Sequence, residues 1–176
     1  MERGLEDMSS ILKVEDLVKY YGEGENQVRA VDHTSLQIER GKFTAIVGRS
    51  GSGKSTLLHL IGGLDRPDSG KVWIDGTDIY SRKDDKLAQF RRKKIGFIFQ
   101  DFQLLDTLTI EENVSLALTI NHVPAKEIKA RVQNIAQILK ITDILEKYPY
   151  QVSGGQKQRC ACARAIIHRP KLILAD

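Results

Sequence analysis

The stretch that decides the fold is Gly48-Arg49-Ser50-Gly51-Ser52-Gly53-Lys54-Ser55. It follows the P-loop spacing G-x-x-x-x-G-K-[ST], in which glycines let the backbone turn tightly and aim its N–H groups at phosphate oxygens. In this pattern Lys54 reaches the β- and γ-phosphates, and the hydroxyl of Ser55 binds Mg²⁺. A Gly/Ser-rich turn that binds nothing has no use for a lysine and a serine directly after the glycines. The stretch therefore predicts a nucleoside triphosphate site.

The segments on both sides of this loop fit a strand–loop–helix unit. Residues 43–47 form a short apolar run, which predicts a buried strand. Residues 55–61 begin a helix that ends at Gly62-Gly63, and the N-terminus of this helix would face the anion and add its dipole to the site. The predicted triphosphate contacts are Gly48, Ser50, Gly51, Gly53, Lys54, Ser55 and Thr56.

The composition is that of a soluble globular protein. Charged residues make up 28% of the 176 residues and hydrophobic residues 41%, and this length fits one domain, or one domain with a sub-domain. The longest stretch without a charge runs from Asn113 to Ala125, which is too short to cross a bilayer. The N-terminus lacks the apolar core of a secretion signal. We therefore expect a cytoplasmic protein.

The net charge of +4 is a mild excess, and its densest part is the run Arg91-Arg92-Lys93-Lys94. Such a run can bind nucleic acid or anionic lipid headgroups. Asp84 and Asp85 lie among the nearby basic residues, and no aromatic platform accompanies them. We therefore interpret the run as a solvated face and expect no nucleic-acid partner.

The two cysteines, Cys160 and Cys162, lie two residues apart in a segment that we interpret as a helix. Their side chains would therefore point in different directions. No metal-ligand partner lies near them in the sequence. We interpret both as small buried hydrophobic side chains of a reduced protein.

The other apolar runs predict a β-rich N-terminal region. Short runs between residues 11 and 38 surround a loop at 22–26, which is typical of antiparallel strands. Residues 70–76 alternate between apolar and polar and end in Asp-Gly, which predicts another strand. Residues 95–99 are continuously apolar, as expected of a buried parallel strand.

Between residues 101 and 152 the pattern becomes helical. Residues 109–112, Thr-Ile-Glu-Glu, have the spacing of a capping box. Pro124 suits the first turn of the next helix. Thr142-Asp143 would cap a further short helix, which Pro149 would end.

Two elements follow this helical region. A helix from about 155 to 168 leads to a last strand at 172–175. The chain is therefore predicted to be an α/β protein. It would have a P-loop core with a mixed sheet and helices, antiparallel strands at the N-terminus and an inserted all-α sub-domain.

Three potential ligand groups directly follow predicted strands. The P-loop, Gln100 and Asp176 each come after a short apolar run. Ligands of open parallel α/β sheets bind beyond the carboxyl ends of the strands, so we expect these groups to converge on one crevice. Asp176 would hold Mg²⁺ directly or through water, and Gln100 would orient water or sense Mg²⁺.

Residues 152–159, Val-Ser-Gly-Gly-Gln-Lys-Gln-Arg, resemble the signature motif of ATP-binding cassette (ABC) ATPases. The P-loop, residues 97–100 (Phe-Ile-Phe-Gln) and residues 172–176 (Leu-Ile-Leu-Ala-Asp) stand in the family's order, and the resemblance extends over the chain from Ile11 onward. In physical terms Ser153-Gly154-Gly155 is a second phosphate-binding turn at a helix N-terminus, and Ser153 also suits a helix cap.

The resemblance implies ATP and Mg²⁺ as ligands and a head-to-tail dimer with a second ATP-binding subunit. Each signature turn, made of Ser153, Gly154, Gly155 and Gln156, would close on the γ-phosphate held by the P-loop of the opposite subunit. Tyr21 matches the aromatic residue that stacks on adenine, with Tyr20 as the alternative. The implied catalytic residues are Lys54, Gln100 and Asp176. The implied Mg²⁺ ligands are Ser55, Gln100 and Asp176.

The resemblance also implies integral membrane permease subunits as partners and a peripheral place on the cytoplasmic face of the plasma membrane. The region from Gln100 to Tyr150 would receive the partner. Segments at 62–70, 92–97 and 102–109 resemble the lipoprotein-releasing, macrolide-export and antimicrobial-peptide-resistance group. The main alternative is a non-transport ABC ATPase that works on nucleic acid or ribosomes.

The sequence ends at Asp176, where the family continues with a catalytic glutamate, a dimer-contact loop and a switch histidine. The resemblance therefore implies an ABC ATP-binding domain that is incomplete at its C-terminus. Its parts would be a β and P-loop core at 1–100, a helical sub-domain at 101–152, and the signature helix and Walker B strand at 153–176. We expect such a fragment to bind ATP and to hydrolyse it negligibly.

Overall fold

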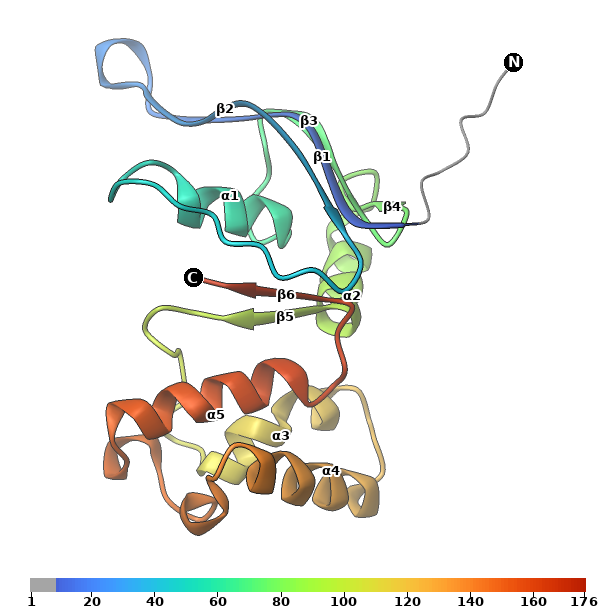
Figure 1. Ribbon diagram of the computed structural model, residues 1–176, viewed down its shortest axis with the longest axis vertical. Helices are drawn as coiled ribbons and strands as arrows, with labels where there is room; N and C mark the ends of the chain where they lie inside the picture. The colour runs from blue at the N-terminus through green and yellow to red at the C-terminus, as the bar shows by residue number, and fades with distance from the viewer. Residues whose placement is uncertain (1–8) are drawn as a thin grey trace. The chain divides into compact units, whose positions relative to one another are not determined.

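The computed structural model describes residues 9–176, which fall into two units (Figure 1). The first unit ends at Arg91, and the second is Arg92–Asp176. The boundaries expected after residues 100 and 152 divide the chain differently and remain predictions. Within the described residues, no helix is long and apolar enough to cross a membrane.

An antiparallel sheet is the frame of the first unit. Its strands lie in the order β2-β1-β3-β4. Their bounds are β1 Ser10–Tyr21, β2 Val28–Glu39, β3 Ser69–Ile74 and β4 Thr77–Asp78. β1 pairs with both β2 and β3, and a 3₁₀ turn, η1 (Gly24–Asn26), connects β1 to β2. The predicted antiparallel strands and the loop between them are thereby confirmed.

An irregularity interrupts the alternation of β1. Leu12 and Val14 are buried, and the register against β2 then shifts before the next buried residue, Leu17. Asp16 and His33 lie at this shift and both have left-handed backbone, with φ of 48° and 44°. His33 Nδ1 lies 2.7 Å from Asp16 Oδ1. The extra residue returns Leu17 to the buried face and leaves this pair on the surface.

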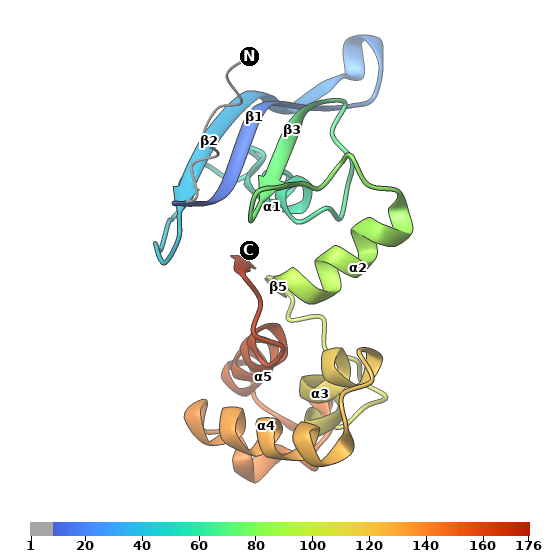
Figure 2. The ribbon, with the colours of Figure 1, turned by 90° about the vertical axis from the view of Figure 1, so that its right-hand side faces the viewer.

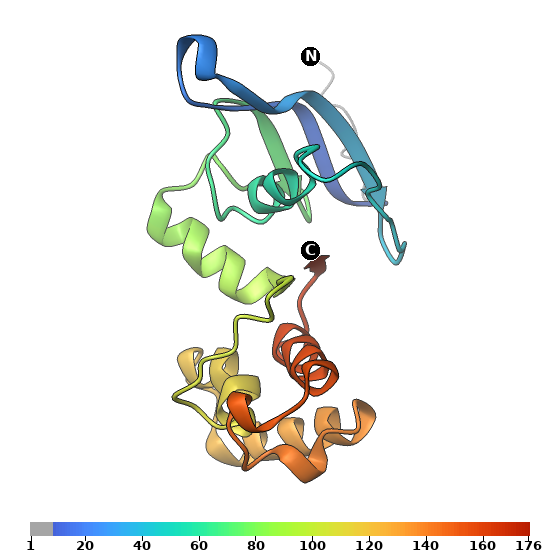
Figure 3. The ribbon, with the colours of Figure 1, turned by 90° about the vertical axis from the view of Figure 1, so that its left-hand side faces the viewer.

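Helix α1 (Lys54–Ile61) follows the P-loop and lies against one face of the sheet (Figures 2 and 3). Its buried residues are Leu57, Leu60 and Ile61. The helix ends at Gly62, as predicted. The helical half of the strand–loop–helix unit is therefore confirmed.

The prediction of a strand before the P-loop, at residues 43–47, is wrong. Residues 43–47 have no strand geometry, and none of the described strands pairs with them. Phe43 is 98% exposed and Val47 is 87% exposed. An apolar run indicates only a propensity, whereas a strand forms through backbone hydrogen bonds to a neighbour. The four strands of the first unit's sheet are paired without this segment.

Helix α2 (Asp84–Lys94) carries the basic run at its C-terminal end. Arg92 and Lys93 are exposed, in agreement with a solvated face. Arg91 differs, because it donates a hydrogen bond of 2.7 Å to the carbonyl oxygen of Gly63. One residue of the run is therefore used in packing α2 near the end of α1.

The second unit contains a two-stranded parallel sheet. β5 (Ile95–Ile98) and β6 (Leu172–Ala175) are paired along their whole length, which confirms the predicted parallel strand. Helix α5 (Gly154–Ile166) packs on β5. A Cβ atom on Gly96 would lie 2.3 Å from the carbonyl oxygen of Ala165, so only glycine allows the helix to come this close.

Helices α3 (Ile110–Ile120) and α4 (Ala125–Ile138) confirm the predicted helical region. Thr109 caps α3 in a capping box with Glu112, as predicted. Pro124, expected in the first turn of the next helix, is instead the N-cap that directly precedes α4. α3, α4 and α5 share one apolar core (Figure 1). Its fully buried residues include Ile110, Val114, Val132, Ala136, Ile141, Cys160 and Ala163.

The two cysteines differ in burial. Cys160 is fully buried in this core, as predicted, whereas Cys162 is only half-buried. Both are free thiols. Burial raises the pKa of the Cys160 thiol to about 11, so this side chain stays protonated near neutral pH.

Two predicted helix ends are wrong. Thr142 and Asp143 lie inside a 3₁₀ turn, η2 (Thr142–Ile144), and cap no α-helix. Pro149 begins a second 3₁₀ turn, η3 (Pro149–Gln151), instead of ending a helix. The fixed φ of proline suits the first position of a helical turn, which explains its place in η3.

Candidate functional site

The P-loop contains glycines at positions where a side chain would be strained, either by overlap with a neighbouring atom or by a left-handed backbone. Gly53 is the N-cap of α1 with φ 82°, and a Cβ atom there would lie 1.9 Å from the carbonyl oxygen of Ala30. A Cβ atom on Gly48 would lie 2.7 Å from Ser52 Oγ. Gly51 has φ 77°. The backbone of the first unit therefore requires glycine in this loop.

Lys54 is the first residue of α1, and its side chain turns back over the loop. Its Nζ donates hydrogen bonds to the carbonyl oxygens of Gly48 at 3.0 Å and Arg49 at 2.7 Å. Ser55 and Thr56 follow it in the first helical turn, where backbone N–H groups have no acceptors within the helix. An ammonium, a hydroxyl and a helix N-terminus gathered at one loop fit a triphosphate. Ser50, the remaining predicted contact, is exposed in the same loop.

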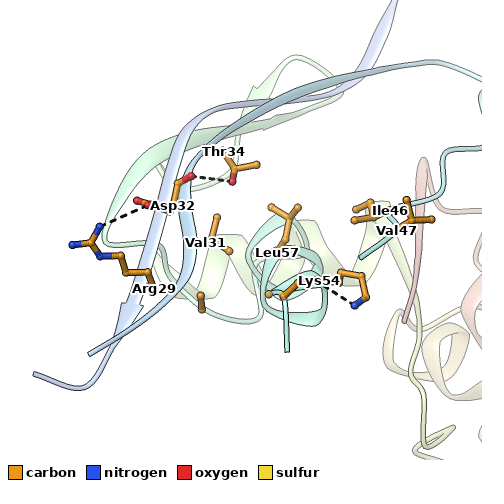
Figure 4. A pocket seen from close by; sticks show the side chains of 11 residues that line it. Arg29, Val31, Asp32, Thr34, Ile46, Val47, Lys54 and Leu57 are labelled. Atoms are coloured by element: carbon orange, nitrogen blue, oxygen red, sulfur yellow. Dashed lines mark hydrogen bonds and ion pairs between the residues drawn. The ribbon is translucent and has the colours of Figure 1, made fainter. Parts of the chain in front are cut away.

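A pocket of about 280 Å³ lies beside the loop (Figure 4). β2, the segment before the P-loop and α1 form its wall. The side chains labelled in the figure are Arg29, Val31, Asp32, Thr34, Ile46, Val47, Lys54 and Leu57. Gly53 and Lys54 belong to the wall, whereas Tyr21 and Ser55 are not among its described residues. The pocket therefore adjoins the P-loop and does not include Tyr21, the predicted base contact.

Tyr21 lies in the same unit as the P-loop and is 43% exposed. Its hydroxyl donates a hydrogen bond of 2.6 Å to Asp65 Oδ2. This bond, together with burial, raises the pKa of Tyr21 to about 12. Lys19 Nζ lies 5.1 Å from the centre of the Tyr21 ring. Tyr20, the alternative base contact, donates instead to the carboxylate of Asp32.

Gln100 and Asp176 follow the carboxyl ends of two paired strands. Ile98, near the end of β5, is the register partner of Ala175 at the end of β6. The amide of Asp176 donates to the carbonyl oxygen of Ile98 at 3.0 Å and so continues the ladder. Gln100 and Asp176 are both exposed at this edge. Their predicted convergence with the P-loop, which belongs to the other unit, stays a prediction.

The signature segment forms a capped helix start. Ser153 is the N-cap of α5, as predicted, and its Oγ accepts a hydrogen bond of 3.3 Å from the amide of Gln156. The side-chain oxygen of Gln156 accepts one of 2.8 Å from the amide of Ser153. A Cβ atom on Gly154 would have no neighbour within 4 Å, and one on Gly155 would meet only the Arg159 guanidinium at 3.9 Å. The described part of the chain therefore leaves open space over both glycines.

Comparison with known families decides the assignment. The family described as "ABC transporter" matches residues 31–176. The chain belongs to this family. The match covers the P-loop, the signature segment and β6, so the assignment made from these motifs is confirmed, and with it the predicted α/β P-loop fold with antiparallel strands and added helices.

Several relatives resemble this cassette closely. YxdL of Bacillus subtilis, an ABC transporter ATP-binding protein, is 49% identical over 96% of the chain and 65% of its own length. The bacitracin export ATP-binding protein BceA of Halalkalibacterium halodurans is 42% identical over 95% of the chain and 66% of its own length. The solved ATP-binding cassette MJ0796, dimeric and bound to ADP and phosphate, is 40% identical with a TM-score of 0.88, over 94% of the chain and 73% of that structure. The chain spans about two thirds of the length of these relatives.

Arg164 is a cassette residue that the motifs did not single out. From the last turns of α5 its guanidinium donates to the carbonyl oxygens of Phe102 and Gln103, which follow Gln100. These two residues have left-handed backbone, with φ of 60° and 46°. Burial lowers the pKa of Arg164. The signature helix is thereby tied to the loop that begins at Gln100.

Asn113 is a second residue that the motifs missed. It is fully buried in α3, accepts a hydrogen bond of 2.7 Å from the amide of Leu105 and donates one of 3.0 Å to its carbonyl oxygen. It also donates to the carbonyl oxygens of Leu108 and Thr109. The segment 105–109 is therefore fastened to α3 by one amide. A sequence signal existed, because a buried helix rarely carries an asparagine without a bonding role.

Proposed function

We propose that the chain is the ATP-binding subunit of an ABC transporter, which couples ATP binding and hydrolysis to export or mechanical work by a membrane partner. The observation that carries the proposal is the P-loop, where glycines forced by the backbone place Lys54 at the N-terminus of α1. Only glycine fits at position 53. The loop also brings together an ammonium, a hydroxyl and a helix N-terminus, which are the groups that bind a triphosphate.

The residues divide into binding and catalytic roles. Lys54 would move its ammonium from the loop carbonyls to the β- and γ-phosphates. Ser55 and Asp176 would supply oxygen ligands for Mg²⁺, with Gln100 as a further ligand that orients water. Bound Mg²⁺ would neutralise the charge that develops on the transferred phosphoryl group. The exposure of Gln100 and Asp176 at one edge supports their joint role.

The proposed working form is a head-to-tail dimer. The open space over Gly154 and Gly155 supports it, because a glycine that its own chain does not require suits the close approach of another molecule. The helix N-terminus capped by Ser153 is an anion-binding end. MJ0796, the solved relative, is dimeric. The phosphate that Ser153, Gly154, Gly155 and Gln156 meet would be the one on the other copy's P-loop.

The proposed partner is an integral membrane permease, which places the subunit on the cytoplasmic face of the membrane. Relatives that are export ATP-binding proteins or ATP-binding/permease proteins support this partner. Leu105 is 45% exposed in the segment that Asn113 fastens to α3, and Arg164 ties the preceding loop to α5. A firmly held loop with an exposed apolar side chain suits docking of a partner helix.

The partner can be identified by crosslinking. Cysteines placed at Leu104 to Thr107 in a Cys160→Ala, Cys162→Ser background should capture an integral membrane protein in cells. The same cysteine placed at Lys42, an exposed position outside the region from Gln100 to Tyr150, is the control and should capture less of it. Capture of ribosomal proteins or DNA at 104–107 would favour a non-transport ABC ATPase.

ATP binding is tested with Lys54→Ala. This change removes the ammonium of the cradle, so calorimetry should show MgATP affinity weakened by about 100-fold or more, as expected for loss of a charge-assisted contact worth about 3 kcal/mol. Lys42→Ala, which removes an exposed lysine before the loop, is the control and should bind as the wild type does. Affinity like that of the wild type in Lys54→Ala would contradict the assignment of the loop.

A further inference from the structure

The two adjacent tyrosines of β1 carry matching sets of partners. The Tyr20 hydroxyl donates to the carboxylate of Asp32, and the guanidinium carbon of Arg29 lies 5.6 Å from its ring centre. The Tyr21 hydroxyl donates to the carboxylate of Asp65, and Lys19 Nζ lies 5.1 Å from its ring centre. Each ring therefore has one acid at its hydroxyl and one cation over its face.

The acids lie in different parts of the first unit. Asp32 is on β2, so the set around Tyr20 stays within the β1–β2 hairpin. Asp65 follows Gly62-Gly63 at the end of α1, the helix that begins in the P-loop. The side chain of Thr56, in the first turn of the same helix, also acts on the Tyr21 hydroxyl and opposes part of the rise in the pKa of Tyr21. Tyr21 is therefore linked to the P-loop helix near both of its ends.

The cation over Tyr21 is itself held in place. Lys19 is only 14% exposed, and its Nζ donates to the carbonyl oxygen of Arg66 at 2.7 Å and to Asp65 Oδ1 at 3.4 Å. Asp68 Oδ1 lies 3.8 Å from the same ammonium. The Tyr80 hydroxyl donates a hydrogen bond of 2.6 Å to the carbonyl oxygen of Asp65, so the backbone at Asp65 is held as well.

These bonds fix the orientation of the Tyr21 ring. A carboxylate sets the direction of the hydroxyl, and an ammonium covers one face, so a second aromatic ring can stack only on the other face. A ring fixed before binding costs less ordering when a ligand stacks on it. Tyr20 has an equally fixed ring, but its partners set it relative to the hairpin and not relative to the P-loop helix.

We propose that Asp65 and Lys19 are positioning residues, which hold Tyr21 as a preformed platform for the purine base of the nucleotide whose phosphates lie on the P-loop. The inference rests on the proposed function, because it concerns the base end of the same nucleotide. Asp65 binds the Tyr21 hydroxyl and follows α1, the helix that begins at Lys54. It would therefore fix the distance between the Tyr21 ring and the phosphate-binding end of the P-loop. The hydroxyl of Tyr21 thus matters for binding, and the ring alone does not suffice.

Tyr21→Phe separates this inference from simple stacking, because it keeps the ring and removes only the hydroxyl bond. If Asp65 positions the ring, the phenylalanine ring of this variant should adopt the binding orientation for only part of the time. MgATP affinity should then fall by about 5-fold. Lys19→Met, which keeps the chain length and removes the cation, should cause a similar loss, and Lys19→Arg should restore most of the affinity. Tyr20→Phe is the matched control and should bind MgATP as the wild type does.

Calorimetry with two probes, MgATP and inorganic tripolyphosphate, makes the test specific. Tripolyphosphate has no base, so its affinity should be equal in the wild type, Tyr21→Phe and Lys19→Met. Unchanged MgATP affinity in both variants would overturn the positioning role. Equal weakening of both probes would also overturn it, because it would indicate a damaged cradle. A wild-type chain that binds neither probe would overturn the proposed function, and the positioning role with it.

Discussion

The P-loop and the signature segment both place glycines at the start of a helix, but for different reasons. At Gly53 a side chain would overlap the carbonyl oxygen of Ala30, and the backbone is left-handed. At Gly154 the space is open, and neither it nor Gly155 has a positive φ. The first glycine is required by the fold of its own chain. The others destabilise their helix without serving that fold, because glycine is a poor helix former.

The P-loop is therefore a site whose shape its own chain determines, whereas the signature segment is completed only by another molecule in the proposed dimer. A glycine that the chain requires indicates a cradle built by the chain itself. A glycine that its own chain does not require indicates that another molecule approaches closely at that position. In the proposed dimer this molecule is the second copy with its bound nucleotide. The comparison can be tested by treating the two helix starts identically.

The largest effect is expected from placing alanine at each position. Gly53→Ala should lower the free energy of unfolding by about 3 kcal/mol, from a left-handed backbone and a steric overlap together. Gly154→Ala should leave it unchanged or raise it by up to about 1 kcal/mol, because alanine favours the helix. Urea unfolding of the two variants and the wild type measures both changes.

Gly51→Ala is the control for backbone conformation. Gly51 has φ 77°, but a Cβ atom there meets nothing within 4 Å. This variant should lose only about 1 kcal/mol, the cost of left-handed backbone without overlap. A loss at Gly154 as large as that at Gly53 would break the comparison, since it would mean that the chain requires both glycines.

A smaller effect is expected on the pH dependence of folding stability, to which one histidine in each unit contributes in the opposite direction. The hydrogen bond to Asp16 raises the pKa of His33 in the first unit above its ordinary value of 6.5. His33 therefore adds stability that is complete below pH 6.5 and is lost as the pH rises through the raised value. Burial lowers the pKa of His168 in the second unit, although its bond to the Ile95 carbonyl opposes this. His168 thus adds stability that is present above pH 6.5 and is lost as the pH falls through the lowered value.

Unfolding curves between pH 5 and 8 for His33→Gln and His168→Gln would measure these contributions. Relative to the wild type, the first variant should lose stability mainly on the acid side and the second mainly on the neutral side. The His33 effect should be slight, because its side chain is 66% exposed. The same pH dependence in both variants would contradict the assigned environments.

Local patterns predicted the elements that depend on nearby residues. The P-loop spacing predicted α1 and its end at Gly62, and the Thr109–Glu112 spacing predicted the capping box of α3. The apolar run at 95–99 predicted a parallel strand, which pairs with β6. In each case the stabilising contact is either within a few residues or common to all buried parallel strands.

The sequence could not predict features that depend on distant partners. The run at 43–47 has the same apolar character as 95–99, but only the second segment has a strand beside it among the described residues. The bond from Tyr21 to Asp65 joins residues 44 positions apart, and the bond from Arg164 to Phe102 joins residues 62 positions apart. No local spacing reveals such pairs, so the supports of the predicted site remained hidden.

In the proposed dimer, a nucleotide on the P-loop of one copy is enclosed by the signature turn of another. Mixing two variants, Lys54→Ala and Gly154→Asp, tests it most directly. The new acid should leave folding intact, because the space at Gly154 is open and an acid suits a helix N-terminus, but it would repel a triphosphate. Each variant alone should form no MgATP-dependent dimer in sedimentation velocity.

The mixture should recover MgATP-dependent dimers that retain nucleotide after rapid gel filtration. In a mixed dimer the intact P-loop of the Gly154→Asp copy faces the intact signature turn of the Lys54→Ala copy, so one site is whole. A mixture as inactive as either variant alone would contradict the claim. It would mean that both loops must be intact in the same chain.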